Sequence, residues 1–191
     1  MTFPKNTFLK FILVFVSVFL ICYFGALFIT GIAIKGGFYS SFVEKYFNLS
    51  AWLRTSLIAG TKLFVSFFNI ETIRTSEYIL RIPNANGIKI VYSCLGFAVM
   101  SFWTAYIIAT AADKQKKIRW LFIGLLLIWI INVLRISMVI IAGRKEWKFP
   151  LGLDHHSWFN IIAYLAIFIM MYLFEKNIKK SYLHESGPFN I

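Results

Sequence analysis

The sequence predicts an α-helical multi-pass membrane protein that forms a single domain over residues 1–191. Of its 191 residues, 59% are hydrophobic and only 15% are charged, and the mean hydropathy is +0.72. Soluble domains average about 45–50% apolar and about 25% charged residues. The apolar residues also gather into long uninterrupted stretches, which is typical of membrane-spanning helices.

Four stretches are expected to cross the membrane: residues 8–30, 94–112, 119–142 and 158–174. Each is long enough, or nearly so, for a hydrocarbon core about 30 Å thick. The first is expected to be a retained anchor helix, because its apolar part exceeds the 7–15 residues of a signal peptide. The C-terminal residues 181–191 are expected to be a loose tail.

Basic residues predict the orientation of these spans. The linker 113–119, "DKQKKIR", carries four Lys or Arg, and Lys176, Lys179 and Lys180 follow the last span. Short basic loops stay in the cytoplasm, so Cys94 and the loop 143–157 are expected on the outer side. The net charge of +12 fits contact with anionic lipid headgroups. We expect no nucleic-acid partner, because the basic residues form no single stripe.

Two interpretations remain for residues 51–70, "AWLRTSLIAGTKLFVSFFNI". A helical wheel places polar residues on one side and large apolar residues on the other, which favours an amphipathic helix at the outer interface. The polar side holds Arg54, Thr61, Lys62, Ser66 and Asn69, and the apolar side holds Trp52, Leu53, Leu63, Phe64 and Phe67. The alternative is a fifth span, which would reverse the side of either the N-terminus or Cys94.

Residues 78–93, "YILRIPNANGIKIVYS", are expected to form a small extracytoplasmic β-hairpin just before Cys94. Two short runs of alternating apolar and polar residues flank "NANG", and Asn and Gly supply the positive φ angles of a tight turn.

Two polar features in the helices attract attention. Cys94 opens the second predicted span, where a small packing residue is the simpler interpretation; Cys22, within the first span, is interpreted as such a residue. Arg135 lies about seven residues, or roughly 10 Å, inside the third span, with Asn132 one turn earlier on the same face. An ionisable residue inside a span marks function by default, although an arginine near a helix end can reach water by extending its side chain.

A third feature is the histidine pair His155 and His156, at the start of the last span. Taken alone, these are ordinary interfacial residues, with Asp154 as a helix N-cap. The predicted topology, however, brings both histidines to the same depth as Cys94 and Arg135. A histidine can take the proton of a thiol, a nearby cation favours the thiolate, and an arginine can stabilise an oxyanion. No Cys and His spacing resembles a zinc site, so we expect neither a metal nor a cofactor.

The ordered set of Cys94, then "NVLRI", then a histidine at the opening of the last helix resembles the exosortase/archaeosortase family of membrane cysteine transpeptidases, and the short Bacteroidetes-type members above all. The resemblance implies catalytic roles for Cys94, Arg135 and one histidine of "DHH". Aligning "FNIIAY" favours His155, and His156 then stands where many relatives have Asp. Gly96 is kept, but Leu95 replaces the small polar residue that follows the cysteine in many members.

The resemblance also implies the reaction, the location and the partners. The chain would be a cysteine protease or transpeptidase in the bacterial cytoplasmic (inner) membrane, with its active site facing outward. Its substrate would be an exported protein with a C-terminal sorting signal made of a short motif, a membrane helix and a basic cluster. Cleavage would pass through a thioester on Cys94, followed by transfer to an acceptor amine or to water. The alternative function is a non-catalytic membrane assembly or transporter subunit.

Overall fold

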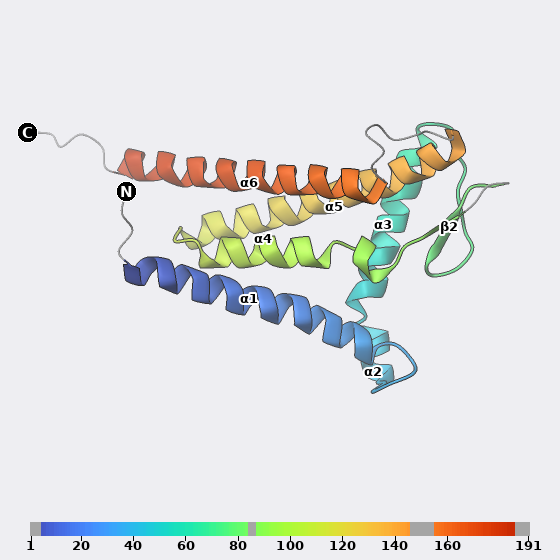
Figure 1. Cartoon of the computed structure of the whole chain (residues 1–191), viewed down its shortest axis with the longest axis horizontal. Helices are drawn as coiled ribbons and strands as arrows, with labels where there is room; N and C mark the ends of the chain where they lie inside the picture. The colour runs from blue at the N-terminus through green and yellow to red at the C-terminus, as the bar shows by residue number, and fades with distance from the viewer. Residues whose placement is uncertain (1–4, 84–86, 146–154, 186–191) are drawn as a thin grey trace, which may run out of the picture.

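The structure is a computed structural model that describes residues 5–83, 87–145 and 155–185, with side chains for residues 7–83, 87–142 and 161–180. Four helices run along the long axis of the molecule, and two further helices and a small sheet lie at one end (Figure 1). The lengthwise helices are α1 (Lys5–Ile32), α4 (Phe97–Ala109), α5 (Lys114–Lys145) and α6 (His155–Glu185).

In the part of the chain that the structure describes, three helices are long and apolar enough to cross a membrane, which fits the prediction of a helical membrane protein. They include Thr7–Ile32 of α1, Lys114–Ala142 of α5 and Ile161–Lys180 of α6. These helices extend beyond the predicted spans because charged residues at their ends continue the helical hydrogen bonding. The apolar stretches therefore locate these helices but understate their length.

Helix α4 is shorter than the span expected at residues 94–112. It has 13 residues, which cover about 20 Å at 1.5 Å per residue. Its N-terminus is set by Gly96, whose φ of 80° lies in the left-handed region, and its C-terminus by Thr110, which is extended. A short 3-10 helix, η1 (Tyr92–Cys94), precedes it. Hydrophobicity alone does not detect these two breaks in the helical backbone.

The basic linker lies near the start of α1 and the end of α6. The start of α1, the connection between α4 and α5, and the end of α6 all lie at one end of the bundle (Figure 1). The start of α4, with η1 before it, lies toward the other end, where α3 and the sheet are found. The arrangement separates the basic linker and the lysines at the end of α6 from Cys94 along the long axis (Figure 1).

Helix α3 (Leu49–Ser66) lies across the end of the bundle, roughly perpendicular to the other long helices (Figure 1). It follows α2 (Ser41–Tyr46), and the Asn48 side chain caps it by accepting a hydrogen bond from the Ala51 backbone N–H at 3.0 Å. Among the described helices, α3 is not one of those long and apolar enough to span a membrane. Its position across the bundle end is the one that an interfacial helix would need.

The buried and exposed sides of α3 differ from those that the helical wheel predicts. Its inward side packs on α5, while large apolar residues such as Trp52, Leu63 and Phe67 are exposed. The buried residues of α3 are Ser50, Arg54, Leu57, Ile58, Thr61 and Val65. Part of the predicted polar side, including Arg54 and Thr61, therefore faces the protein.

A three-stranded antiparallel sheet lies beside α3 and has the order β1 (Ile73–Arg74), β2 (Ile79–Arg81), β3 (Ile88–Lys89). Strands β2 and β3 pair with Ile79 opposite Lys89 and Leu80 opposite Ile88. Both strands fall within the expected hairpin, but its turn residues 84–86 lie outside the described residues, so the complete hairpin stays a prediction. Strand β1 is an addition that the alternating pattern did not reveal.

Two apolar clusters hold the fold together. One joins α3, the sheet and α5 through buried residues such as Leu57, Leu80 and Val133. The other joins α4, α5 and α6 around Trp103 and Phe174. The Tyr106 hydroxyl adds a hydrogen bond from α4 to Glu175 of α6, at 3.0 Å.

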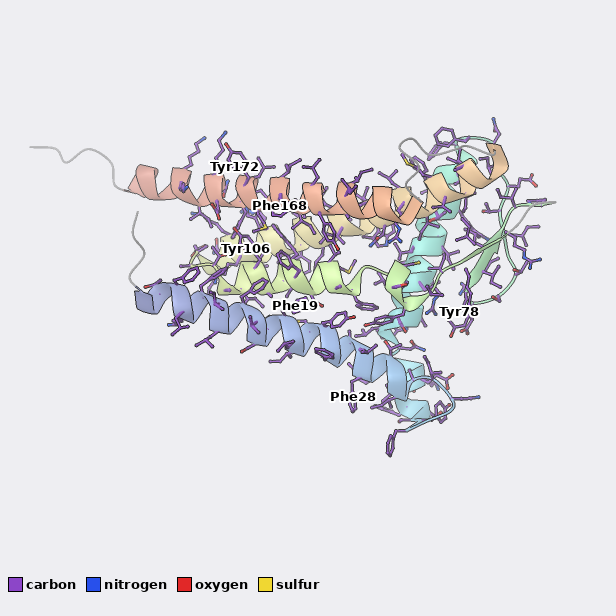
Figure 2. All side chains as sticks on the ribbon, in the orientation of Figure 1. Phe19, Phe28, Tyr78, Tyr106, Phe168 and Tyr172 are labelled. Atoms are coloured by element: carbon purple, nitrogen blue, oxygen red, sulfur yellow. The ribbon has the colours of Figure 1, made fainter. Side chains whose placement is uncertain are left out.

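Side chains on the outer surfaces of the long helices are apolar too. Tyr106 lies within the bundle, whereas Tyr172 of α6 and Phe28 of α1 lie on its outside (Figure 2). Without lipid such a surface would be exposed to water at a large cost, so the same pattern that keeps the bundle together suits it to a membrane.

Two glycines allow neighbouring helices to approach α5 closely. A Cβ on Gly124 of α5 would overlap the indole of Trp103, and a Cβ on Gly60 of α3 would lie 2.8 Å from the indole of Trp129. Each indole also donates a hydrogen bond: Trp103 Nε1 to the Trp120 carbonyl at 3.2 Å, and Trp129 Nε1 to Ser56 Oγ at 3.1 Å. The tryptophans thus fit between the helices both sterically and through hydrogen bonds.

We expect Gly124→Ala to lower the free energy of unfolding by about 1–3 kcal/mol, because the added methyl group overpacks the Trp103 contact. The matched control is Gly25→Ala in α1, where nothing lies within 4 Å of the added Cβ. Thermal unfolding of the purified protein in detergent measures both. Equal stability of the two variants would contradict the close packing of α4 on α5.

Candidate active site

Cys94 is the last residue of η1 and precedes the first residue of α4, Phe97, by three residues. Its backbone N–H donates to the Val91 carbonyl at 2.9 Å, and the next N–H, of Leu95, donates to the Tyr92 carbonyl at 3.0 Å. The cysteine is half-buried and free, as is Cys22. The short turn therefore holds the thiol at a helix start without sealing it inside the protein.

Asn132 of α5 lies directly against the turn that follows Cys94. Its Nδ2 donates a hydrogen bond to the Leu95 carbonyl at 3.4 Å, and the Asn132 side chain is 7% exposed. A Cβ on residue 96 would overlap Nδ2 of Asn132, and φ is 80° there, so both the space and the backbone favour glycine. Asn132 and Gly96, predicted as supporting residues, are brought together by the structure.

Arg135 follows Asn132 by three residues, about 4.5 Å farther along α5. Its side chain is half-buried. Its neighbour Ile136 belongs, with Val133, to the apolar cluster that contains Leu95 and against which Cys94 packs. The turn of α5 that carries Arg135 therefore adjoins the segment around Cys94.

The predicted histidines lie in a part of the chain for which no side chains are described. The α6 backbone begins at His155 and continues through His156, and this first turn lies toward the same end of the bundle as η1 (Figure 1). Asp154 lies outside the described residues. The proximity of these side chains to Cys94 accordingly stays a prediction.

Tyr92 adds a polar group two residues before Cys94. Its ring stacks on Phe97 with centroids 5.1 Å apart, and in the described part of the chain its buried hydroxyl has no hydrogen-bond partner. Burial raises the pKa of this phenol, and the nearby Tyr23 of α1 raises it further. The hydroxyl therefore keeps its proton near neutral pH and can act only as a neutral donor or acceptor.

Arg54 is a second arginine close to the candidate site, and the helical wheel had placed it on a solvent-facing polar side. It is only 5% exposed. Its Nε donates to the Ile90 carbonyl at 3.2 Å, and its guanidinium carbon lies 4.2 Å from the Tyr78 ring centroid. Arg54 thus ties α3 to the residues next to β2 and β3, on the segment that leads to Cys94.

A signal for Arg54 is present in the sequence. Arg54 falls on the same side of the helix as Leu57, Ile58 and Val65, at the i, i+3, i+4 spacing of a buried face. Grouping the polar residues of α3 hid this apolar neighbourhood. A cation inside such a face needs a specific partner, which the Ile90 carbonyl and the Tyr78 ring supply.

Comparison of the chain with protein-family models, with curated proteins and with solved structures gives no match.

The contact between Gly96 and Asn132 can be tested by a double-mutant cycle. Gly96→Ala should be destabilising, because alanine is strained at this φ and overlaps Asn132. Asn132→Ala should also destabilise, since the buried Leu95 carbonyl loses its donor. The double variant should lose less than the sum, by about 0.5–3 kcal/mol, because truncating the side chain at position 132 leaves room for a methyl group at position 96. Additive effects in thermal unfolding would mean that the two residues are independent.

Arg54→Lys should lower the free energy of unfolding by about 1–3 kcal/mol. The positive charge stays buried while the hydrogen bond from Nε and the flat stacking on Tyr78 are lost. The matched control is Arg81→Lys, at an exposed position of β2, which should stay within about 0.5 kcal/mol of wild type. A stable Arg54→Lys variant would show that charge alone suffices at this position.

Proposed function

We propose that this chain is a membrane-embedded cysteine protease or transpeptidase of the exosortase/archaeosortase type. The observation that carries the proposal is the position of Cys94. Its turn is held by a hydrogen bond from Asn132, and Asn132 lies on the same helix, α5, as Arg135. The start of α6, with His155 and His156, lies toward the same end of the bundle and supports the same grouping. Cys22 is also free and half-buried, so the feature that distinguishes Cys94 is the buried contact between Asn132 and the turn that carries the thiol.

In the proposed reaction, a histidine, His155 before His156, takes the proton of the Cys94 thiol. The thiolate attacks the carbonyl carbon of the scissile peptide bond, and its oxygen becomes an oxyanion that Arg135 stabilises. Collapse of this intermediate breaks the C–N bond, and the histidine returns its proton to the departing amine. A thioester on Cys94 remains, and an acceptor amine or water then attacks it and releases the thiol.

We propose a bacterial cytoplasmic membrane as the location, with Cys94 toward the outer side. Support comes from the basic residues near the α4–α5 connection and at the end of α6, which lie at one end of the bundle, away from Cys94. The positive-inside rule places such residues in the cytoplasm. Helix α3, across the opposite end, then lies along the outer interface with Trp52, Leu63 and Phe67 toward lipid.

The proposed substrate is an exported protein that ends in a short motif, one membrane helix and a basic cluster. The exposed apolar surfaces of α1 and α6 suit contact with lipid or with such a helix. The basic cluster would stay on the cytoplasmic side and hold the motif near the outer end of the bundle, where Cys94 lies.

The rival function, a non-catalytic assembly or transporter subunit, draws support from Arg54. That residue demonstrates that an arginine in this fold can be fully occupied by packing on an aromatic ring and a carbonyl. If Arg135 had a similar task, it could not also stabilise an oxyanion at Cys94. The two functions differ in whether a change at Cys94 alters the chemistry of a second protein.

We expect Cys94→Ala to abolish processing of a co-expressed candidate substrate and Arg135→Gln to slow it by about 10²–10³-fold, the effect of losing one oxyanion-stabilising group. Cys22→Ala, in α1, is the matched control and should process normally. Substrate size and membrane attachment are followed on gels, and membrane insertion of each variant is verified. Normal processing by both inserted variants would exclude the enzyme and favour the rival.

A further inference from the structure

The outer edge of β3 presents backbone groups that the sheet does not use. The Ile90 N–H donates to the Tyr78 carbonyl at 2.7 Å. Hydrogen-bonded and non-bonded pairs alternate along antiparallel strands, so Leu80 and Ile88 form the next bonded pair. Lys89 and Ile79, which lie opposite each other between these pairs, are not bonded. The N–H and C=O of Lys89 therefore point away from β2.

The backbone groups of β2 bond to strands on both sides, whereas those of β3 bond on one side only. On its other side, β2 bonds to β1, as the Thr75 N–H donating to the Ile79 carbonyl at 3.1 Å illustrates. Strand β3 is an edge of the sheet, and the described residues offer no acceptor or donor to the Lys89 backbone. An unpaired edge is a template for another strand.

This open edge leads directly to the thiol. Lys89 precedes Cys94 by five residues, and between them the Ile90 carbonyl is held by Arg54. A polypeptide that paired with β3 would thus lie next to the turn that carries Cys94. The segment between β3 and this turn is held in place by its contacts with Arg54 and with the residue before β2.

The side chains at the edge favour an acidic partner. Leu80 and Ile90 point into the core, so the alternate residues Arg81 and Lys89 lie on the opposite face, and both are exposed. A residue paired with Lys89 would have its side chain on this basic face. Opposite charges across paired strands are favourable.

We propose that an extended acidic segment of the substrate pairs with β3 as a fourth strand, through the backbone N–H and C=O of Lys89. The proposal rests on the proposed function, because the strand is assigned to the substrate of Cys94. It deepens that function by naming a recognition surface, backbone pairing, and a chemical class, an acidic extended peptide.

The test uses the full-length Cys94→Ala protein in detergent and a fluorescent seven-residue peptide that alternates valine with glutamate. We expect saturable binding by fluorescence anisotropy. N-methylation of alternate amides, on the side that would face β3, should weaken binding about tenfold or more by removing backbone donors. Exchanging glutamate for lysine in the peptide should weaken it about fivefold.

Two protein variants complete the test. Lys89→Glu should reverse the preference, so that the lysine peptide binds better than the glutamate peptide. Lys89→Pro removes one N–H from the open edge and leaves the β2–β3 bonds in place, and should weaken both peptides. Absent or unsaturable binding, equal binding of the N-methylated peptide, or unchanged binding by Lys89→Pro would each overturn the proposal. A dimer that occupies β3 would also overturn it.

The binding assay is independent of catalysis, because the protein lacks the thiol. Peptide binding without substrate processing by wild type would refute the proposed enzyme but keep the strand pairing. Processing without peptide binding would do the reverse.

Discussion

Asn132 occupies the space that a side chain at residue 96 would need, and much of the candidate site depends on this contact. It brings the start of α4 against the middle of α5 and gives the Leu95 carbonyl a donor at the point where helical bonding has not yet begun. The left-handed Gly96 ends the turn that carries Cys94. The Asn132 amide and the absence of a Cβ at Gly96 therefore fix the position of the thiol relative to α5. Because Arg135 is also on α5, they fix its position relative to the thiol as well.

A second constraint acts from the opposite side of the same segment. Arg54 is buried beneath the sheet, where an unpaired charge would be costly, and its partners are the Ile90 carbonyl and the Tyr78 ring. These contacts hold the strands just before the Cys94 turn, as Asn132 holds the residues just after it. The segment from Ile90 to Gly96 is thus fixed from α3 and from α5, although it contains little regular structure itself.

The long helices could be predicted from the sequence because hydrophobicity persists over their full length. The length of the apolar stretch overestimated α4, because the ends of this helix depend on the backbone angles at Gly96 and Thr110 rather than on composition. The inward side of α3 was misread because Arg54 shares it with Leu57 and Val65. Residue type and depth single out Cys94 and Arg135 in the sequence, and their catalytic roles stay predictions. The contact between Asn132 and Gly96 could not, since it depends on how α4 and α5 are aligned, which no local pattern encodes. The roles of His155 and His156 remain predictions.

The short length of α4 has a consequence for the depth of the thiol. A hydrocarbon core is about 30 Å thick, and 13 residues cover about 20 Å of it, so a helix that starts at one boundary ends about 10 Å before the other. Tyr92, beside Cys94, lies near Tyr23, and α1 continues nine residues farther, to Ile32. With the bundle upright in a bilayer and the end of α4 at the cytoplasmic boundary, Cys94 would lie about 10 Å short of the outer boundary of the hydrocarbon core. At that depth, the proposed substrate, which carries its own membrane helix, would approach Cys94 from within the bilayer.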